Sequence, residues 1–183
     1  MITFVSDYSL IMTKKQFSII QSALILFAES GFDAISTSKI AAHAGVSEGL
    51  IFRHFVNKEG LLEAILSLGH EKANGYFEEI IQTEDPKERL KKIIELPLTI
   101  SVEEYPFWRL TYALKWQRGI YRDFSEPLEI SLSDAFEQLG YAQPLLEAKL
   151  VLVYMDGIVT EMLLKGTEYS TSITQLFIDK YQL

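Results

Sequence analysis

Residues 36–55 carry the clearest chemical pattern in the chain, because they read as two short helices joined by a tight turn. Ser36 can cap the first helix with its hydroxyl oxygen, and Ser47 can cap the second. Gly45 stands where the chain must reverse, and glycine adopts a positive φ without a steric penalty. Val46 would then be buried in the corner. A helix, a glycine-containing turn and a second helix place that second helix in the major groove of DNA. The pattern therefore predicts a DNA-binding protein.

The charge balance bears on this prediction. The chain of 183 residues holds 25 acidic and 17 basic residues, for a formal net charge of −8. The excess is uneven: residues 1–66 hold five basic and six acidic residues, whereas residues 67–183 hold twelve and nineteen. Attraction to phosphate decays over a Debye length of about 8–10 Å, so a local basic face can bind DNA although the remainder is acidic. The acidic remainder also disfavours nonspecific binding.

Composition excludes several classes of function. Without cysteine, the chain has no disulfide, thiolate nucleophile or cysteine-bound metal. Its longest apolar runs, Ala23–Ala28 and Leu150–Met155, are too short to span a bilayer, and no secretory signal opens the chain. His70 and Glu71 are adjacent and so point to different sides of a helix. No phosphate-binding glycine loop or nucleophile motif occurs. We expect a cytoplasmic protein without enzyme activity, cofactor, metal or membrane partner.

Prolines, glycines and capping residues divide the chain into helices. Apolar residues recur at spacings of three and four, while no convincing strand alternation, repeat or low-complexity tract occurs. The expected helices are residues 13–30, two within 36–55, one from Asn57 to about Ile81, one from near Lys87 that Pro97 ends or kinks, one near Pro106, one from Ser125 to Gly140, one from Pro144 to Gly166, and a last one with Ile173, Leu176, Phe177 and Tyr181. The chain is therefore expected to be all-α, with about nine helices.

The expected helix from Leu145 to Lys165 is apolar nearly all round. Such a helix must be buried on every side, so one flank can face its own core and the other a second subunit. Gly157 costs about 1 kcal/mol relative to alanine in the middle of a helix, which favours close approach of another backbone there. A central core helix in a monomer is the alternative. We favour a homodimer.

The segment from Lys14 to about Ile65 resembles the DNA-binding domain of tetracycline-repressor-type (TetR family) regulators. The resemblance rests on Leu26–Ile35 and on the pattern Ile-Ala-x-x-Ala-Gly-Val-Ser-x-Gly-x-Ile-Phe-x-His-Phe-x-Asn-Lys-x-x-Leu over Ile40–Leu61. It implies an N-terminal three-helix, helix-turn-helix DNA-binding domain and a C-terminal helical domain for ligand binding and dimerisation. The implied division is an N-terminal extension over 1–12, the DNA-binding domain over 13–60, and the effector-binding and dimerisation domain over 61–183.

The resemblance also implies a mechanism. Each subunit of a homodimer presents one recognition helix to one half of a near-palindromic operator, and a small-molecule effector that enters the C-terminal domain moves the fourth helix and releases the DNA. The expected function is a sequence-specific transcriptional repressor on double-stranded operator DNA. Two alternatives stay open: a helix-turn-helix module that binds a protein partner, and an activator without a small-molecule ligand.

Position by position, the resemblance assigns a DNA-binding face. Hydroxyls and unpaired N–H groups at the start of the first motif helix can hold a phosphate. The family usually has tyrosine where Phe52 stands, so Phe52 is expected to contact a thymine methyl or simply to pack. Glu48 must accept a hydrogen bond from a cytosine amine or point away. Arg53 is the strongest candidate for direct contact. The assigned residues are Ser36, Ser38, Ser47, Glu48, Gly49, Phe52, Arg53, His54 and Lys58.

Two further sets of residues follow from helical spacing and from the resemblance. Residues 105–122 hold both tryptophans and several tyrosines, and such a stripe suits a ligand cavity, although core packing explains it without a ligand. Residues 154–158 resemble the family's dimerisation helix. The expected ligand pocket is Tyr105, Trp108, Arg109, Tyr112, Trp116 and Tyr121. The expected dimer interface is Tyr154, Gly157, Ile158, Leu176 and Phe177.

Overall fold

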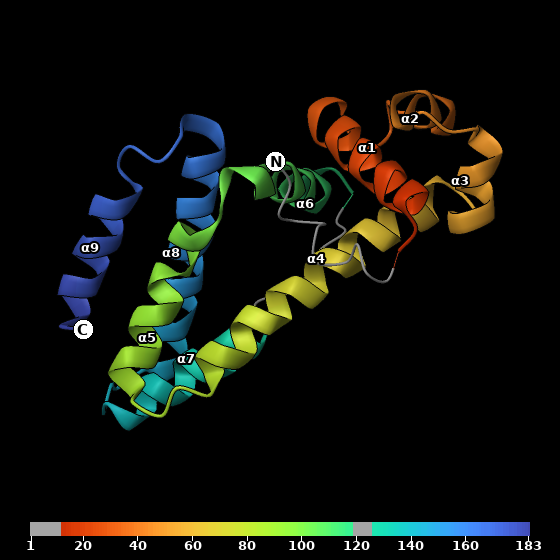
Figure 1. Ribbon diagram of the computed structural model, residues 1–183. Coiled ribbons are helices and arrows are strands. Elements are labelled where there is room, and N and C mark those ends of the chain that lie inside the picture. The colour runs from red at the N-terminus through yellow and green to blue at the C-terminus, as the bar shows by residue number, and fades with distance from the viewer. Residues whose placement is uncertain (1–11, 119–125) are drawn as a thin grey trace. The chain divides into compact units, whose positions relative to one another are not determined.

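The computed structural model describes residues 12–118 and 126–183 of the chain (Figure 1). Within these ranges all regular structure is helical, which confirms the expected all-α class with about nine helices. The helices are α1 (Lys14–Ser30), α2 (Thr37–Ala44), α3 (Glu48–Phe55), α4 (Lys58–Ile81), α5 (Pro86–Glu95), α6 (Tyr105–Arg118), α7 (Glu126–Gln138), α8 (Pro144–Lys165) and α9 (Ser170–Tyr181). Two short 3-10 turns, η2 (Leu96–Thr99) and η3 (Val102–Glu104), separate α5 from α6.

The helices begin and end close to the residues that the sequence indicates. The Thr13 hydroxyl accepts a hydrogen bond from the backbone N–H of Gln16 at 3.2 Å, which satisfies one of the unpaired donors at the start of α1. Asn57 Oδ1 accepts one from the N–H of Gly60 at 2.7 Å at the start of α4. The C-terminal end of α5 also lies where the sequence indicates, because Pro97 is in the 3-10 turn that follows Glu95.

The described residues divide into two compact units, and each has its own packing. Unit 1 holds the described residues up to Lys72 together with those from Ser101 through α6, and unit 2 holds Ala73–Ile100 and the described residues from α7 onward. The division by packing therefore falls within α4 and not at residue 60. The expected functional boundary at residue 60 stays a prediction.

Within unit 1, α6 is fixed to α4 at two points. The ring of Phe107, which is fully buried, lies directly on the backbone of Gly69. Three residues away on each segment, Lys72 Nζ and the Glu104 carboxylate form an ion pair at 2.7 Å, with only 13% and 11% of the side chains exposed. Glu104 also accepts a hydrogen bond from the N–H of Ser101 at 2.8 Å, so both of its oxygens are used. A buried ion pair keeps one geometry when its atoms are satisfied in this way.

Unit 2 is built from the part of α4 after Lys72 and from α5, α7, α8 and α9, around a separate apolar core. Its fully buried members include Leu90, Ile93, Leu132, Ala148 and Val151. Aromatic residues fasten α9: the rings of Tyr154 and Phe177 stack with 4.2 Å between centroids, and the Tyr181 hydroxyl donates to Glu147 at 2.7 Å. The Tyr154 hydroxyl donates to Thr174 Oγ1 at 2.6 Å. Burial raises the pKa of both tyrosines, so both hydroxyls stay protonated donors at neutral pH.

Two glycines of α4 test the contact between Phe107 and Gly69. A Cβ at Gly69 would overlap the Phe107 ring, whereas a Cβ at Gly75 meets nothing within 4 Å. Gly69→Ala is expected to lower the free energy of unfolding by about 1–3 kcal/mol, the usual penalty of overpacking. Gly75→Ala is expected to raise it by up to about 1 kcal/mol, because alanine is the better helix former. Urea unfolding followed by circular dichroism measures both. Equal gains from the two substitutions would show that the ring does not seat on Gly69.

Candidate nucleic-acid interface

The turn between α2 and α3 has the geometry of a helix-turn-helix. Gly45 adopts φ +67° and ψ +36°, and its N–H reaches the carbonyl oxygens of Ala41 and Ala42. The N–H of Val46 donates to the oxygen of Ala41 at 3.0 Å, so the chain reverses within three residues. Val46 is half-buried, less than the sequence led us to expect. Ile51 is fully buried and holds α3 against the unit.

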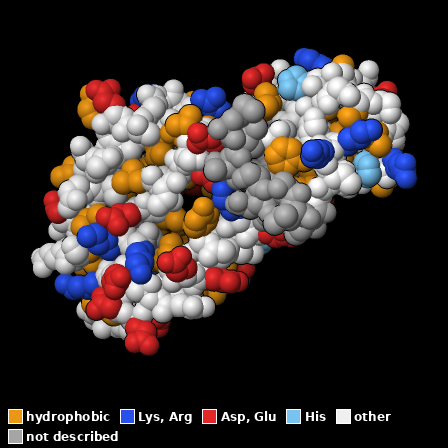
Figure 2. Space-filling model, viewed as in Figure 1, with side chains coloured by type: hydrophobic (Ala, Val, Ile, Leu, Met, Phe, Trp, Pro, Cys, Tyr) orange, Lys and Arg blue, Asp and Glu red, His pale blue; other side chains and the backbone are white. Residues whose placement is uncertain are grey.

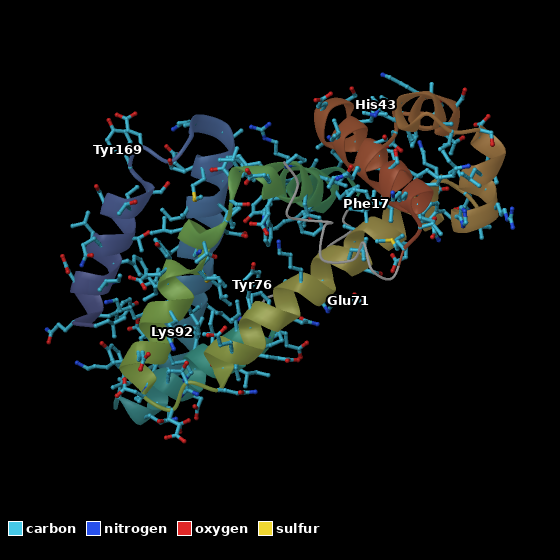
Figure 3. The ribbon with its side chains drawn as sticks, viewed as in Figure 1. Phe17, His43, Glu71, Tyr76, Lys92 and Tyr169 are labelled. Atoms are coloured by element: carbon cyan, nitrogen blue, oxygen red, sulfur yellow. The ribbon has the colours of Figure 1, made fainter. Side chains whose placement is uncertain are left out.

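Hydrogen bonds from α1 fix α2 in place. The Ser18 hydroxyl donates to the carbonyl oxygen of Ala44 at 3.0 Å. His43 lies where α2 passes α1 (Figure 3), and its Nδ1 is 2.9 Å from Oγ of the buried Ser22. His43 therefore joins two helices. Among the described residues, no group of three or more His, Asp or Glu side chains could hold a metal ion.

Three expected DNA contacts share the outer face of α3. Gly49, Phe52 and Arg53 are all exposed, and their spacing of three and four residues puts them together, away from the buried Ile51. Phe52 is 47% exposed, so about half of its surface is not covered by the protein. The guanidinium of Arg53 has no hydrogen-bond or ion-pair partner in the part of the chain that the structure describes. On the face shown in Figure 2, Lys and Arg side chains gather over α1–α3.

The serines at the starts of α2 and α3 surround this face. The Ser36 hydroxyl accepts a hydrogen bond from the N–H of Lys39 at 3.2 Å and can still donate its proton. Ser38 is exposed in the first turn of α2. Ser47 stands at the N-cap of α3, but its hydroxyl makes no capping hydrogen bond. A hydroxyl left unpaired at a helix start suits an anionic oxygen. The expected phosphate contacts of Ser36 and Ser38 and the expected DNA contact of Ser47 stay predictions.

Glu48, the half-buried first residue of α3, is hydrogen-bonded within the motif. Its Oε1 accepts a hydrogen bond from the Thr37 hydroxyl at 2.5 Å, which ties the first residue of α3 to the first residue of α2. This hydrogen bond occupies one oxygen of the half-buried carboxylate. Whether Glu48 also contacts a cytosine amine stays a prediction.

Lys58 and His54 are engaged within the protein. Lys58 Nζ donates to the carbonyl oxygens of Phe32 and Ile35, each at 3.0 Å, and lies 4.3 Å from the centre of the Phe32 ring. The ammonium satisfies the carbonyls of the loop before α2, where no helix supplies a donor. The expected contact of Lys58 with the DNA backbone stays a prediction. The half-buried ring of His54 meets the Phe55 ring edge-on at 6.2 Å.

The junction between α3 and α4 is a feature that sequence reasoning missed. Val56 has φ +68° and ψ −49°, and the N–H of Asn57 donates to the oxygen of Phe55 at 2.8 Å, which makes a γ-turn. A Cβ at Gly60 would overlap that same Phe55 oxygen. The first turn of α4 therefore lies directly on the end of α3. A glycine three residues after the capping Asn57 was the available signal.

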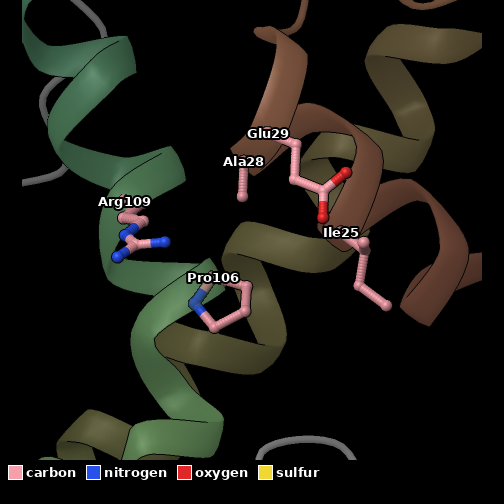
Figure 4. Close-up of a pocket in the computed structure, with 5 residues that line it drawn as sticks. All are labelled: Ile25, Ala28, Glu29, Pro106 and Arg109. Atoms are coloured by element: carbon pink, nitrogen blue, oxygen red, sulfur yellow. The ribbon is translucent and has the colours of Figure 1, made fainter.

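The expected pocket residues come from α6, with one exception. Tyr105, Trp108 and Tyr112 are half-buried, whereas Trp116 is 80% exposed, which does not fit an enclosed pocket. Tyr121 lies outside the described residues. Arg109 lines a hollow of about 80 Å³ in unit 1 with Ile25, Ala28, Glu29 and Pro106 (Figure 4). Ligand pockets usually hold about 300–1,000 Å³, so this hollow is too small for an effector.

The expected dimer residues separate into two groups. Tyr154 and Ile158 are buried in the core of unit 2, and Phe177 stacks on Tyr154, so these residues do not form an outer face. Gly157 and Leu176 are exposed. The outer face of α8 carries large apolar side chains at spacings of three, four and seven residues around Gly157. These are Leu146, Leu150, Val153 and Leu164, with exposed fractions of 59%, 40%, 69% and 76%. None of the described helices is long and apolar enough to cross a membrane.

Comparison with known proteins gives these features a family context. The sequence pattern described as "Bacterial regulatory proteins, tetR family" matches residues 19–65, which include all of α2 and α3. The fatty acid metabolism regulator protein of Bacillus subtilis (strain 168) is 39% identical over 87 residues, which are 48% of this chain and 42% of that protein. The chain thus spans less than half the length of the curated relatives it matches.

Solved structures share the fold of the chain. A TetR transcriptional regulator from Legionella pneumophila aligns with a TM-score of 0.68 at 23% identity, over 91% of this chain and 96% of that one. The fatty acid degradation regulator FadR from Bacillus halodurans aligns with a TM-score of 0.59 at 23% identity, over 88% and 96%. At these identities the likeness establishes the fold: a helix-turn-helix domain followed by a helical C-terminal part.

Val56 offers a test of the γ-turn between α3 and α4. A β-branched residue with positive φ is strained, and this side chain is 76% exposed, so little burial is lost on its removal. Val56→Gly is expected to raise the free energy of unfolding by about 1 kcal/mol. Val102 is 72% exposed and has no positive φ, so Val102→Gly should lower stability by about 0.5–1 kcal/mol. Thermal unfolding compares the two. A loss of stability in Val56→Gly would mean that the turn is not strained.

Proposed function

Residues 19–65 belong to the tetR family of bacterial regulatory proteins, and from this premise we propose that the chain is a homodimeric transcriptional repressor, released from operator DNA by a small molecule. The observation that carries the DNA-binding part is the outer face of α3. Gly49, Phe52 and Arg53 are exposed there, next to the exposed Ser47, and the Glu48 carboxylate accepts a hydrogen bond from Thr37. A recognition helix reads bases with such a face.

The charges near this face favour DNA despite the net charge of −8. Arg53 and Lys39 are exposed, and the nearest acid in the motif, Glu48, is held by Thr37. Phosphate contacts supply much of the affinity and fix the register of the protein on the duplex. The acidic C-terminal part repels DNA elsewhere, which restricts binding to the motif and favours specific over nonspecific sites.

The homodimer rests on the outer face of α8. Leu146, Leu150, Val153 and Leu164 leave an exposed apolar stripe, with the bare backbone of Gly157 at its centre. Contiguous exposed apolar surface marks an interaction site. A two-fold axis across this stripe pairs each residue with its equivalent in the partner, and a dimer of this symmetry suits an operator of two half-sites about 34 Å apart.

The proposed binding surface for the effector is on α6. Half-buried Tyr105, Trp108 and Tyr112 of α6 keep the aromatic stripe as the proposed ligand-facing surface, without Trp116. Because one relative is a fatty acid metabolism regulator, long-chain acyl compounds are the first effectors to test. Release of a bound duplex by such a compound, followed by fluorescence anisotropy, would identify the class.

Selection of random duplexes by the purified protein near physiological salt tests the function itself. Enrichment of a near-palindrome, with half-sites one helical turn apart, is the expected result. A folded protein that enriches no sequence would contradict the proposal and favour a helix-turn-helix module that binds a protein.

Arg53 and Lys58 are both cations of the motif, and the structure gives them different roles. Arg53→Ala should weaken binding to a selected duplex by roughly ten- to a hundredfold and leave stability unchanged. Lys58→Met should lower the free energy of unfolding by about 1.5–3 kcal/mol, because two carbonyl oxygens lose a charged donor. Lys58→Met should not reduce the slope of log affinity against log salt concentration.

Lys39→Met is the control for this comparison, because Lys39 is exposed and has no internal partner for its ammonium among the described residues. It should not alter stability. A fall of about one in the salt slope of Lys58→Met would return Lys58 to the phosphate contacts.

Gly157 tests the dimer. A Cβ at this position meets nothing within 4 Å in the protomer, so Gly157→Leu should not disturb the protomer's own packing. It should block close approach of the partner's helix and shift the sedimentation mass from dimer to monomer. Gly75→Leu, at another open position on a helix, is the control and should stay dimeric. A dimeric Gly157→Leu would rule out this face.

A further inference from the structure

The outer face of α3 is poor in hydrogen-bonding groups. Gly49 has no side chain, Phe52 has a bare aromatic ring, and Arg53 supplies the single charged group of the three. The polar side chains of Glu48 and Lys58 are already used within the protein, on Thr37 and on two carbonyl oxygens. Hydrogen bonds from this face to base edges are therefore few, and apolar contact must carry more of the recognition.

Phe52 is the residue that can make such a contact. It is 47% exposed, although it stands next to the fully buried Ile51. The described part of the chain gives its ring no aromatic or cation partner. Without a hydroxyl, the ring can neither donate to a phosphate nor pair with a base edge.

Among the four bases, thymine alone presents a methyl group in the major groove. An apolar side chain on a recognition helix discriminates by burying that methyl against itself. The neighbouring Arg53 adds the complementary preference, since a guanidinium pairs with the O6 and N7 atoms of guanine. Phe52 and Arg53 are consecutive residues that lie on either side of Gly49 on the exposed surface of α3, so the two side chains can contact different positions of one half-site.

We propose that Phe52 reads a thymine C5-methyl group in each operator half-site, beside a guanine that Arg53 contacts. This inference rests on the proposed function and specifies which groups of the DNA the protein distinguishes. The protein would then distinguish half-site sequences largely by burying the thymine methyl group against the Phe52 ring, away from water.

The test replaces each thymine of a selected duplex by deoxyuridine, one position per half-site at a time. This substitution removes the C5-methyl and leaves base pairing unchanged. At the contacted position, wild-type affinity should fall about fourfold per half-site, the effect of one buried methyl group. In Phe52→Ala, the same substitution should have no effect, because the methyl has already lost its partner.

Arg53→Ala is the matched control. It should lower affinity for the thymine and uracil duplexes alike and preserve their fourfold ratio. Phe52→Leu, which keeps an apolar group on the same side of the helix, should retain part of the ratio and provides a second variant if Phe52→Ala unfolds. Circular dichroism verifies that each variant is folded.

The outcomes separate this inference from the proposed function. Tight binding of a selected duplex with no effect of uracil at any position overturns the methyl contact and leaves the repressor proposal intact. A uracil effect that persists in Phe52→Ala and Phe52→Leu assigns the methyl to another residue and overturns the role of Phe52. Failure to select any duplex overturns both.

Discussion

The arrangement of the helix-turn-helix in unit 1 depends on the carbonyl oxygen of Phe55. This oxygen stands at the end of α3 and accepts the N–H of Asn57 across the γ-turn at Val56, and a Cβ at Gly60 of α4 would overlap it. This close backbone contact fixes the direction in which α4 leaves α3. Because Lys58, in the same turn of α4, also holds the carbonyl oxygens of Phe32 and Ile35, a shift of α4 would disturb both ends of the motif at once.

Hydrogen bonds within the motif also determine which side-chain groups α3 exposes. Thr37 holds Glu48, and the loop before α2 holds Lys58, so two charged groups near the recognition helix are used to build the motif. What stays outside is an aromatic ring, a guanidinium and a backbone without a side chain. Some charged side chains of this short segment therefore hold the motif together, and each one used in this way offers fewer hydrogen-bonding groups to a partner.

Sequence reasoning succeeded where local chemistry decides the outcome. Caps such as Thr13 and Asn57 and punctuating residues such as Gly45 and Pro97 act within four residues, so helix ends could be predicted. The partners of Lys58 lie 23 and 26 residues away, which no local pattern reveals. The sequence also could not predict which side of α8 faces the core. A helix that is apolar all round gives no sign that Tyr154 and Ile158 face inward while Val153 and Gly157 face out.

The most direct measurement of the central claim is amide hydrogen exchange of the full chain, free and bound to a selected duplex. The account predicts that protection on binding concentrates at residues 36–38 and 47–53, the starts of α2 and α3 and the outer face of the recognition helix, because these backbone groups approach phosphates and bases. Protection confined to α8 and α9, with none at residues 47–53, would contradict it and place the DNA contact elsewhere.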